Sequence, residues 1–192
     1  MTPDERLERY AELTVRVGAN VQPGQLVDIG GLVEHAPLVR ALARACYRAG
    51  ARYVEASYGD GHVRRARIRH APEDTLSSTP GWLLERERLL GREHGAAIGI
   101  TGDPEPDLLA DLPGDRVGKA RMIALAEETM KQVNERTVNW TGVAFPTEGT
   151  IGYYCEAHGA SGGIGMSGII VVANLPSVST DPTAISADAE AG

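Results

Sequence analysis

The chain has 192 residues, of which 42% are hydrophobic and 23% are charged, and its formal net charge is -7. This length suits one full domain and part of a second. The negative charge argues against nucleic acid or an anionic membrane surface as the main partner. No apolar run reaches the length of a transmembrane helix, and the charged first ten residues lack the apolar core of a signal peptide. We therefore expect a cytoplasmic protein that binds neither nucleic acid nor membrane.

Helical and strand patterns alternate along the first three quarters of the chain. Apolar residues at helical spacing predict helices over 7–21, 38–49, 62–70, 82–94 and 115–135. Short apolar runs predict strands over 25–29, 52–57, 96–101 and 138–145. Pro37 fits the first turn of the second helix, and Gly50 fits its end. This alternation predicts an α/β fold with a mostly parallel sheet and flanking helices.

The composition changes abruptly near Gly149. All 19 lysines and arginines precede that point, and the last of them is Arg136. Glycines are then dense up to Gly168, as is typical of turns and loops. We predict three segments: an α/β domain over 1–148, a β-hairpin over 149–173, and a small, polar, disordered tail over 174–192.

The predicted hairpin carries three potential metal ligands, Cys155, His158 and Met166. A thiolate and a neutral imidazole bind copper strongly, while a distant thioether is a weak axial ligand. The pattern Tyr-Tyr-Cys-Glu-Ala-His, the Gly-Met-Ser-Gly step and the β-branched strand after it resemble the C-terminal ligand loop of plastocyanin-like cupredoxins. That resemblance implies a type 1 copper site for electron transfer. A complete site needs a second histidine upstream, which is missing here, so we expect a partial copper site in a fragment of a cupredoxin.

Other motifs have simpler interpretations. The glycine pattern over 163–168 fits a dinucleotide-binding fingerprint, but a strand rather than a helix follows it, so we treat this match as accidental. We expect Cys46 to be a core residue and the arginines over 64–69 to form a solvated helix face. The remaining histidines are predicted to be surface or capping residues: His35, His62, His70 and His94.

Several segments of the first 148 residues share their order and spacing with a known family. These segments are 13–24, 33–42, 47–54, 62–67 and 138–147. Together they resemble the first domain of the aminopeptidase T family of metallo-aminopeptidases. The resemblance implies a cytoplasmic, dimeric, two-metal exopeptidase with two domains. The family's metal-binding residues lie in its C-terminal domain, beyond the point where this sequence diverges, so none can be assigned here. We expect the divalent metal pair and the peptidase activity to be absent, and a homodimer to form through the α/β domain.

Three hypotheses follow for the whole chain. The first is a metallo-aminopeptidase relative that lacks its catalytic half and carries a partial copper-binding loop. The second is a copper-binding electron-transfer protein. The third is a chimeric or mis-assembled sequence with no joint function, and the conflict between exported cupredoxins and a cytoplasmic N-terminus favours this third hypothesis over the second.

Overall fold

The computed structural model describes the backbone of residues 2–145, 149–160 and 164–172, and the side chains of Thr2 and of residues 4–145. The chain forms two compact units, Met1–Phe145 and Pro146–Gly192, which are described separately below.

The first unit is built on a four-stranded parallel sheet with the strand order β2-β1-β3-β4. Its strands are β1 (Leu26–Leu32), β2 (Tyr53–Gly59), β3 (Ala96–Thr101) and β4 (Asn139–Ala144). All four predicted strands are present within a few residues of their expected bounds. Ile29 of β1 pairs with Ala56 of β2 on one side and with Ile98 of β3 on the other. The predicted parallel α/β fold is confirmed.

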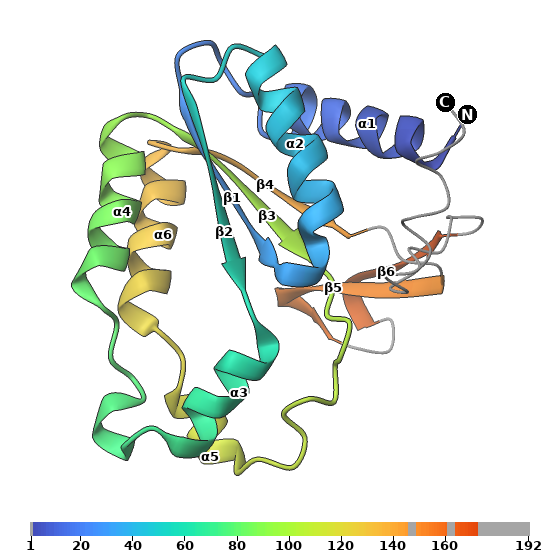
Figure 1. The fold of residues 1–192 in the computed structure, drawn as a ribbon. Helices are drawn as coiled ribbons and strands as arrows, with labels where there is room; N and C mark the ends of the chain where they lie inside the picture. Colours follow the sequence, from blue (N-terminus) through green and yellow to red (C-terminus); the bar gives the residue numbers. More distant parts are fainter. Residues whose placement is uncertain (1, 146–148, 161–163, 173–192) are drawn as a thin grey trace, which may run out of the picture. The chain divides into compact units, whose positions relative to one another are not determined.

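Helices cover both faces of this sheet (Figure 1). One face carries α1 (Pro3–Leu13) and α2 (Ala36–Arg48), and the other carries α4 (Gly81–Arg92) and α6 (Ile123–Glu135). The shorter helices α3 (Gly61–His70) and α5 (Gly114–Lys119) lie beyond the carboxyl ends of the strands (Figure 1).

The main hydrophobic core lies between the sheet and the α1/α2 layer. Alternate residues of β1, Val27 and Ile29, point into it, and α2 contributes the fully buried Leu38 and Leu42. Burial of each such aliphatic side chain stabilises the fold by about 1.5–3 kcal/mol. Cys46 of α2 is a buried free thiol in the same cluster, as predicted.

The first helix differs from its predicted bounds for a local reason. It begins earlier, at Pro3, because Thr2 and Glu5 form a reciprocal capping box. The helical path then continues through a π-helical turn, η1 (Thr14–Gly18), in place of a regular end to the helix.

The helix predicted over 115–135 is divided into α5 and α6. Helix α5 ends at Lys119, and Ala120–Met122 link it to α6. The guanidinium of Arg67 donates to the carbonyl oxygen of Ala120 at 3.2 Å. In a continuous helix this carbonyl would accept a hydrogen bond from a backbone amide four residues later.

Arginine–carbonyl hydrogen bonds hold α3 and α5 together. Arg116 donates to the carbonyl oxygens of Ile68 and Ala71 at 2.9 and 2.7 Å, and Arg67 donates to those of Leu76 and Ser78 as well as Ala120. Arg65 pairs with Asp111 and also donates to a backbone carbonyl. The predicted solvated arginine face is therefore wrong for Arg65 and Arg67, which are half-buried structural donors.

The second unit contains the antiparallel strands β5 (Gly149–Ala160) and β6 (Ile164–Val172). Their pairing agrees with the hairpin predicted from the sequence. The register is regular from Gly149↔Val172 to Tyr154↔Ser167, then shifts, and resumes at Gly159↔Gly165.

Candidate functional site at the carboxyl edge of the sheet

The strand order defines where a ligand would be expected to bind. The chain passes from β1 to β2 on one side of the sheet and then returns to β3 on the other side. In doubly wound sheets, ligands bind outside the carboxyl ends of the strands at the point where the order reverses. Here that point lies between the end of β1 and the end of β3.

The side chain of His35 occupies this position. It belongs to the 3-10 helix η2 (Val33–His35), and only 2% of its surface is exposed. The amide N–H of Leu32 donates to its Nδ1 at 3.0 Å, and its Nε2 lies 2.8 Å from the carbonyl oxygen of Gly102. Since Nδ1 accepts, the proton is assigned to Nε2, which donates to Gly102.

The imidazole of His35 also stacks on the Phe145 ring, with 4.9 Å between the ring centroids. The side chain therefore joins the residues that end β1, β3 and β4. The predicted capping role of His35 is confirmed by its bond to Leu32, but the predicted surface position is wrong because the ring is buried. We conclude that His35 fills the usual ligand crevice of the fold and has a structural role there.

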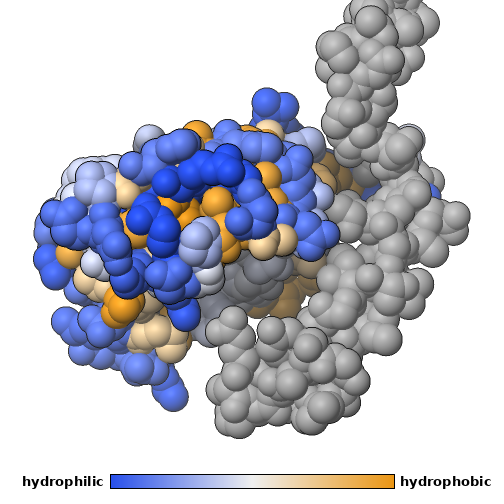
Figure 2. Space-filling view, turned by 90° about the horizontal axis from the view of Figure 1, so that it is seen from below, coloured by the Kyte–Doolittle hydropathy of each residue, from blue (hydrophilic) through white to orange (hydrophobic). Residues whose placement is uncertain are grey.

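An open groove lies beside this edge, beyond the end of β2. Its volume is about 1120 Å³, and it is bounded by the start of α3, the start of α4 and the first turns of α6. The apolar side chains of Val63, Trp82 and Ile123 line it together with the guanidinium-bearing residues Arg64 and Arg121. Viewed from the end of the sheet where the strands stop, hydrophobic residues show between strongly hydrophilic ones (Figure 2). Sequence reasoning missed this groove because its walls come from distant segments.

A second polar cluster lies between the sheet and α4. Arg86 donates to Ser57 Oγ at 2.7 Å, and Ser57 donates to Asp28 Oδ1 at 2.9 Å. Burial raises the pKa of Asp28, and it also raises the pKa of the neighbouring Glu87. Arg86 Nε is buried without a hydrogen-bond partner in the described part of the chain. The adjoining cavity of about 210 Å³ is too small for an ordinary ligand pocket. The cluster is best explained as a link between strand and helix.

The side chains described up to residue 145 contain no group of three or more His, Cys, Asp or Glu residues that could hold a metal ion. Among the histidines, His62 is exposed and its Nε2 lies 3.0 Å from a Glu105 carboxylate oxygen, while His70 and His94 are exposed at helix ends, as predicted. Burial raises the pKa of the Cys46 thiol to about 11, which disfavours the thiolate that a metal requires.

The three predicted copper ligands lie in the second unit. Cys155 and His158 belong to β5, and Met166 belongs to β6. Their side chains lie outside the described ones, so their distances to one another are not part of the described structure.

In the described residues, no helix is both long and apolar enough to cross a membrane.

The fold first defines the class: an α/β domain with a doubly wound parallel sheet. Comparison with known proteins then defines the family. Residues 3–153 match the family described as thermophilic metalloprotease (M29), and the chain belongs to this family. The structure is similar to that of wild-type AmpT from Thermus thermophilus, with a TM-score of 0.68 and 35% sequence identity over 74% of this chain and 36% of that one.

Curated relatives give the same result. Aminopeptidase T of Thermus thermophilus is 36% identical over 145 residues, which cover 74% of this chain and 35% of that protein. Aminopeptidase 2 of Geobacillus stearothermophilus is 35% identical over 149 residues, which cover 75% of this chain and 35% of that protein. The chain therefore spans about a third of the length of these relatives.

These comparisons support the predicted aminopeptidase T resemblance but not the predicted cupredoxin segment. The family match continues to Tyr153, which is five residues beyond the predicted boundary at 148. The start of the predicted copper hairpin thus belongs to the matched M29 region. The cupredoxin resemblance has no support from the matched family or from these relatives, so it does not define the fold of the second unit.

Proposed function

We propose that this chain provides the N-terminal α/β part of an M29-type metallo-aminopeptidase and has no peptidase activity of its own. The relatives that carry the name aminopeptidase are about three times as long as the matched region. A two-metal hydrolase needs carboxylates and histidines that hold both ions and generate a hydroxide nucleophile. The observation that carries the proposal is that residues up to 145 offer no such cluster among their described side chains.

Hydrolysis of aminoacyl p-nitroanilides tests this proposal. The purified chain should release no nitroaniline above the buffer rate with zinc, cobalt or magnesium ions present, while a full-length M29 aminopeptidase serves as the positive control. Metal-dependent release by this chain that is stopped by a chelator, and that co-purifies with the protein, would show that it contains a complete catalytic centre.

A second candidate function is copper binding by Cys155, His158 and Met166. The observation in its favour is the backbone register of β5 and β6. Residues 155–158 of β5 lie between the paired positions Tyr154↔Ser167 and Gly159↔Gly165, and only Met166 lies between the same pairs on β6. All three candidate positions therefore fall in the irregular stretch of the hairpin, where the backbone is free of regular strand pairing. A thiolate, an imidazole and a thioether suit copper, although one imidazole is missing from a complete type 1 site.

Copper titration followed by absorption spectroscopy tests the second candidate. A working blue-copper site gives an intense thiolate-to-copper(II) band at about 600 nm. We expect a weak band or none, with copper(I) retained more strongly by the unaltered chain than by Cys155→Ser. Cys46→Ala is the matched control, because that thiol is buried in the other unit. Equal copper(I) retention by the unaltered chain and Cys155→Ser would exclude the site.

Two further expectations and one alternative remain. We propose that the protein is cytoplasmic and that it dimerises through its α/β unit. Light scattering after size-exclusion chromatography would measure the mass of the dimer. The alternative of a chimeric sequence is tested by reading one continuous DNA clone across codons 149–160. An interruption of the reading frame there would favour the chimera over a selected fusion.

A further inference from the structure

We propose that the groove beyond the end of β2 binds an acidic peptide segment that carries large apolar side chains. The inference depends on the groove itself and does not require peptidase activity or copper binding. Four features support it: exposed apolar walls, two arginines without partners among the described residues, few acidic groups to oppose an acidic ligand, and room for a short peptide segment.

The apolar walls come from three helices and one strand. Trp82 at the start of α4 is 67% exposed, Val63 of α3 is 67% exposed, and Ile123 of α6 is 60% exposed. Tyr58 and Met130 add exposed fractions of 44% and 54% at the margins of the same groove. Apolar side chains scattered singly need no explanation, but a set of them around one concavity indicates a binding surface. Aromatic and thioether groups are especially suited to holding a ligand's apolar side chains.

Two of the three arginines that line the groove have no other partner among the described side chains. Neither Arg64 nor Arg121 has a side-chain hydrogen bond or ion pair within the described residues, although both line the groove. Neighbouring cations are used differently, since Arg65 pairs with Asp111 and Lys119 pairs with Glu73. An uncommitted guanidinium binds a carboxylate through two parallel hydrogen bonds, so this pair favours an anionic ligand.

Opposing acidic groups are few. Asp60 lines the groove, but its Oδ1 accepts from the amides of His62 and Val63 at 2.8 and 3.0 Å, as the N-cap of α3. Glu127 is the other acidic residue of the lining, which also includes Arg67. Arg67 keeps its positive charge while it donates to backbone carbonyls. The groove therefore has more positive than negative groups, although the whole chain carries a net charge of -7.

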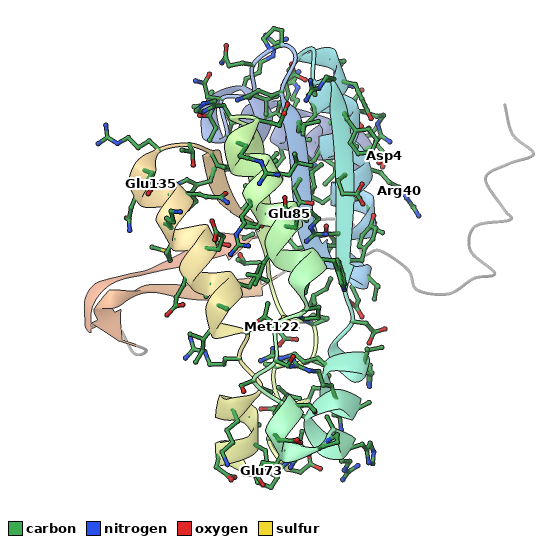
Figure 3. The ribbon with its side chains drawn as sticks, turned by 90° about the vertical axis from the view of Figure 1, so that its left-hand side faces the viewer. Asp4, Arg40, Glu73, Glu85, Met122 and Glu135 are labelled. Carbon is green, nitrogen blue, oxygen red and sulfur yellow. The ribbon has the colours of Figure 1, made fainter. Side chains whose placement is uncertain are left out.

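The groove is large enough to hold a short peptide segment. Its volume of about 1120 Å³ exceeds the usual range of about 300–1,000 Å³ for small-molecule pockets. Figure 3 shows Met122, which lines the groove, where α6 begins and above the helices α3 and α5. The lining residues thus come from α3 on one side and from α4 and α6 on the other, which leaves room for a segment of a few residues.

Fluorescence anisotropy with a labelled probe tests the proposal. The probe is a hexapeptide of alternating glutamate and leucine that ends in phenylalanine, and its matched control has lysine in place of every glutamate. We expect the acidic probe to bind about tenfold more tightly than the lysine peptide, and binding to weaken with added salt because exposed charges are screened. Equal binding of both peptides would overturn the proposal.

Variants then locate the binding surface. The double variant Arg64→Glu/Arg121→Glu should weaken binding by about tenfold or more, since each replaced guanidinium loses a charge-assisted contact and adds repulsion. Arg40→Glu is the matched charge control, because Arg40 is exposed on α2, well away from Met122 (Figure 3). Equal weakening by Arg40→Glu would show nonspecific charge attraction and overturn the proposal.

Trp82→Ala tests the apolar wall separately, and it removes a side chain that is mostly exposed, so folding should be preserved. We expect it to weaken binding of the acidic probe about fivefold or more, given the usual weight of aromatic residues in binding. Unchanged binding by this variant would overturn the proposed apolar contact. A single-stranded oligonucleotide and phosphatidylserine vesicles serve as competitors, and displacement of the probe by either at lower concentration than the unlabelled peptide would overturn the assignment to a peptide.

Discussion

Replacement of His35 by alanine should destabilise the first unit strongly. The substitution removes the buried imidazole that accepts from the Leu32 amide and donates to the Gly102 carbonyl, and both of these hydrogen bonds are part-buried. A fully buried polar group left without its partner costs about 1–3 kcal/mol; because water can reach both part-buried partners, we expect about 1–3 kcal/mol for the pair together, and the cavity left by the buried imidazole adds about 1 kcal/mol. The stacking contact with Phe145 is lost as well.

Urea denaturation followed by tryptophan fluorescence measures this effect. Both tryptophans, Trp82 and Trp140, belong to the first unit, so their emission reports on that unit alone. With a urea dependence of about 2 kcal/mol per molar, a total loss of about 2–4 kcal/mol lowers the midpoint for His35→Ala by about 1–2 M. His70→Ala is the matched control, since His70 is exposed, and its stability should stay within about 0.5 kcal/mol of the parent chain. A loss below about 1 kcal/mol for His35→Ala would refute the structural role assigned to the imidazole.

Other substitutions test the remaining contacts. Arg67→Ala should cost about 2–4 kcal/mol in thermal or urea unfolding, because three backbone carbonyls lose a charged donor, whereas Arg69→Ala at an exposed surface pair should cost less than about 0.5 kcal/mol. Gly95→Ala should cost about 1–3 kcal/mol, since the new Cβ would lie 2.8 Å from a backbone carbonyl oxygen, and Gly81→Ala, where that space is open, should not destabilise. Asp28→Asn should raise stability at neutral pH, because burial raises the pKa of the folded carboxyl above its ordinary 3.8 and its charged form is disfavoured. The contribution of Asp28 to the free energy of unfolding falls as pH rises from 3.8 through its folded pKa. The advantage of Asp28→Asn should therefore vanish in unfolding curves below about pH 4. A constant advantage at all pH values would contradict the assignment to the buried carboxylate.

The core of the α/β unit was predictable because its signals are local. Val27 and Ile29 alternate along β1, and Leu38, Leu42 and Cys46 recur at helical spacing along α2, so their burial follows from backbone periodicity alone. The same reasoning could not locate the groove. Its walls are brought together by the packing of α3, α4 and α6, which are separated by many residues in the chain.

The sequence also suggested a copper site because Cys155, His158 and Met166 are close in the chain and chemically suited to the metal. Proximity in sequence does not fix side-chain geometry. The family was instead established by the match over residues 3–153, most of which precede the hairpin. The predicted ligands stay a prediction for the copper titration to decide.

The sequence by itself determined the alternation of strands and helices, the apolar face of each element and the family, because these depend on local periodicity and on the order of segments. Only the tertiary structure decided which polar residues are buried. The sequence predicts that His35 is a surface or a capping histidine, and only the structure shows that it caps Leu32 from a buried position between the ends of β1 and β3. Arg67 was expected to be solvated, yet it is half-buried and donates to the carbonyl of Ala120, which lies between α5 and α6. Each side chain donates to a carbonyl more than 50 residues away in the chain, Gly102 for His35 and Ala120 for Arg67. No local sequence pattern encodes such a distant partner.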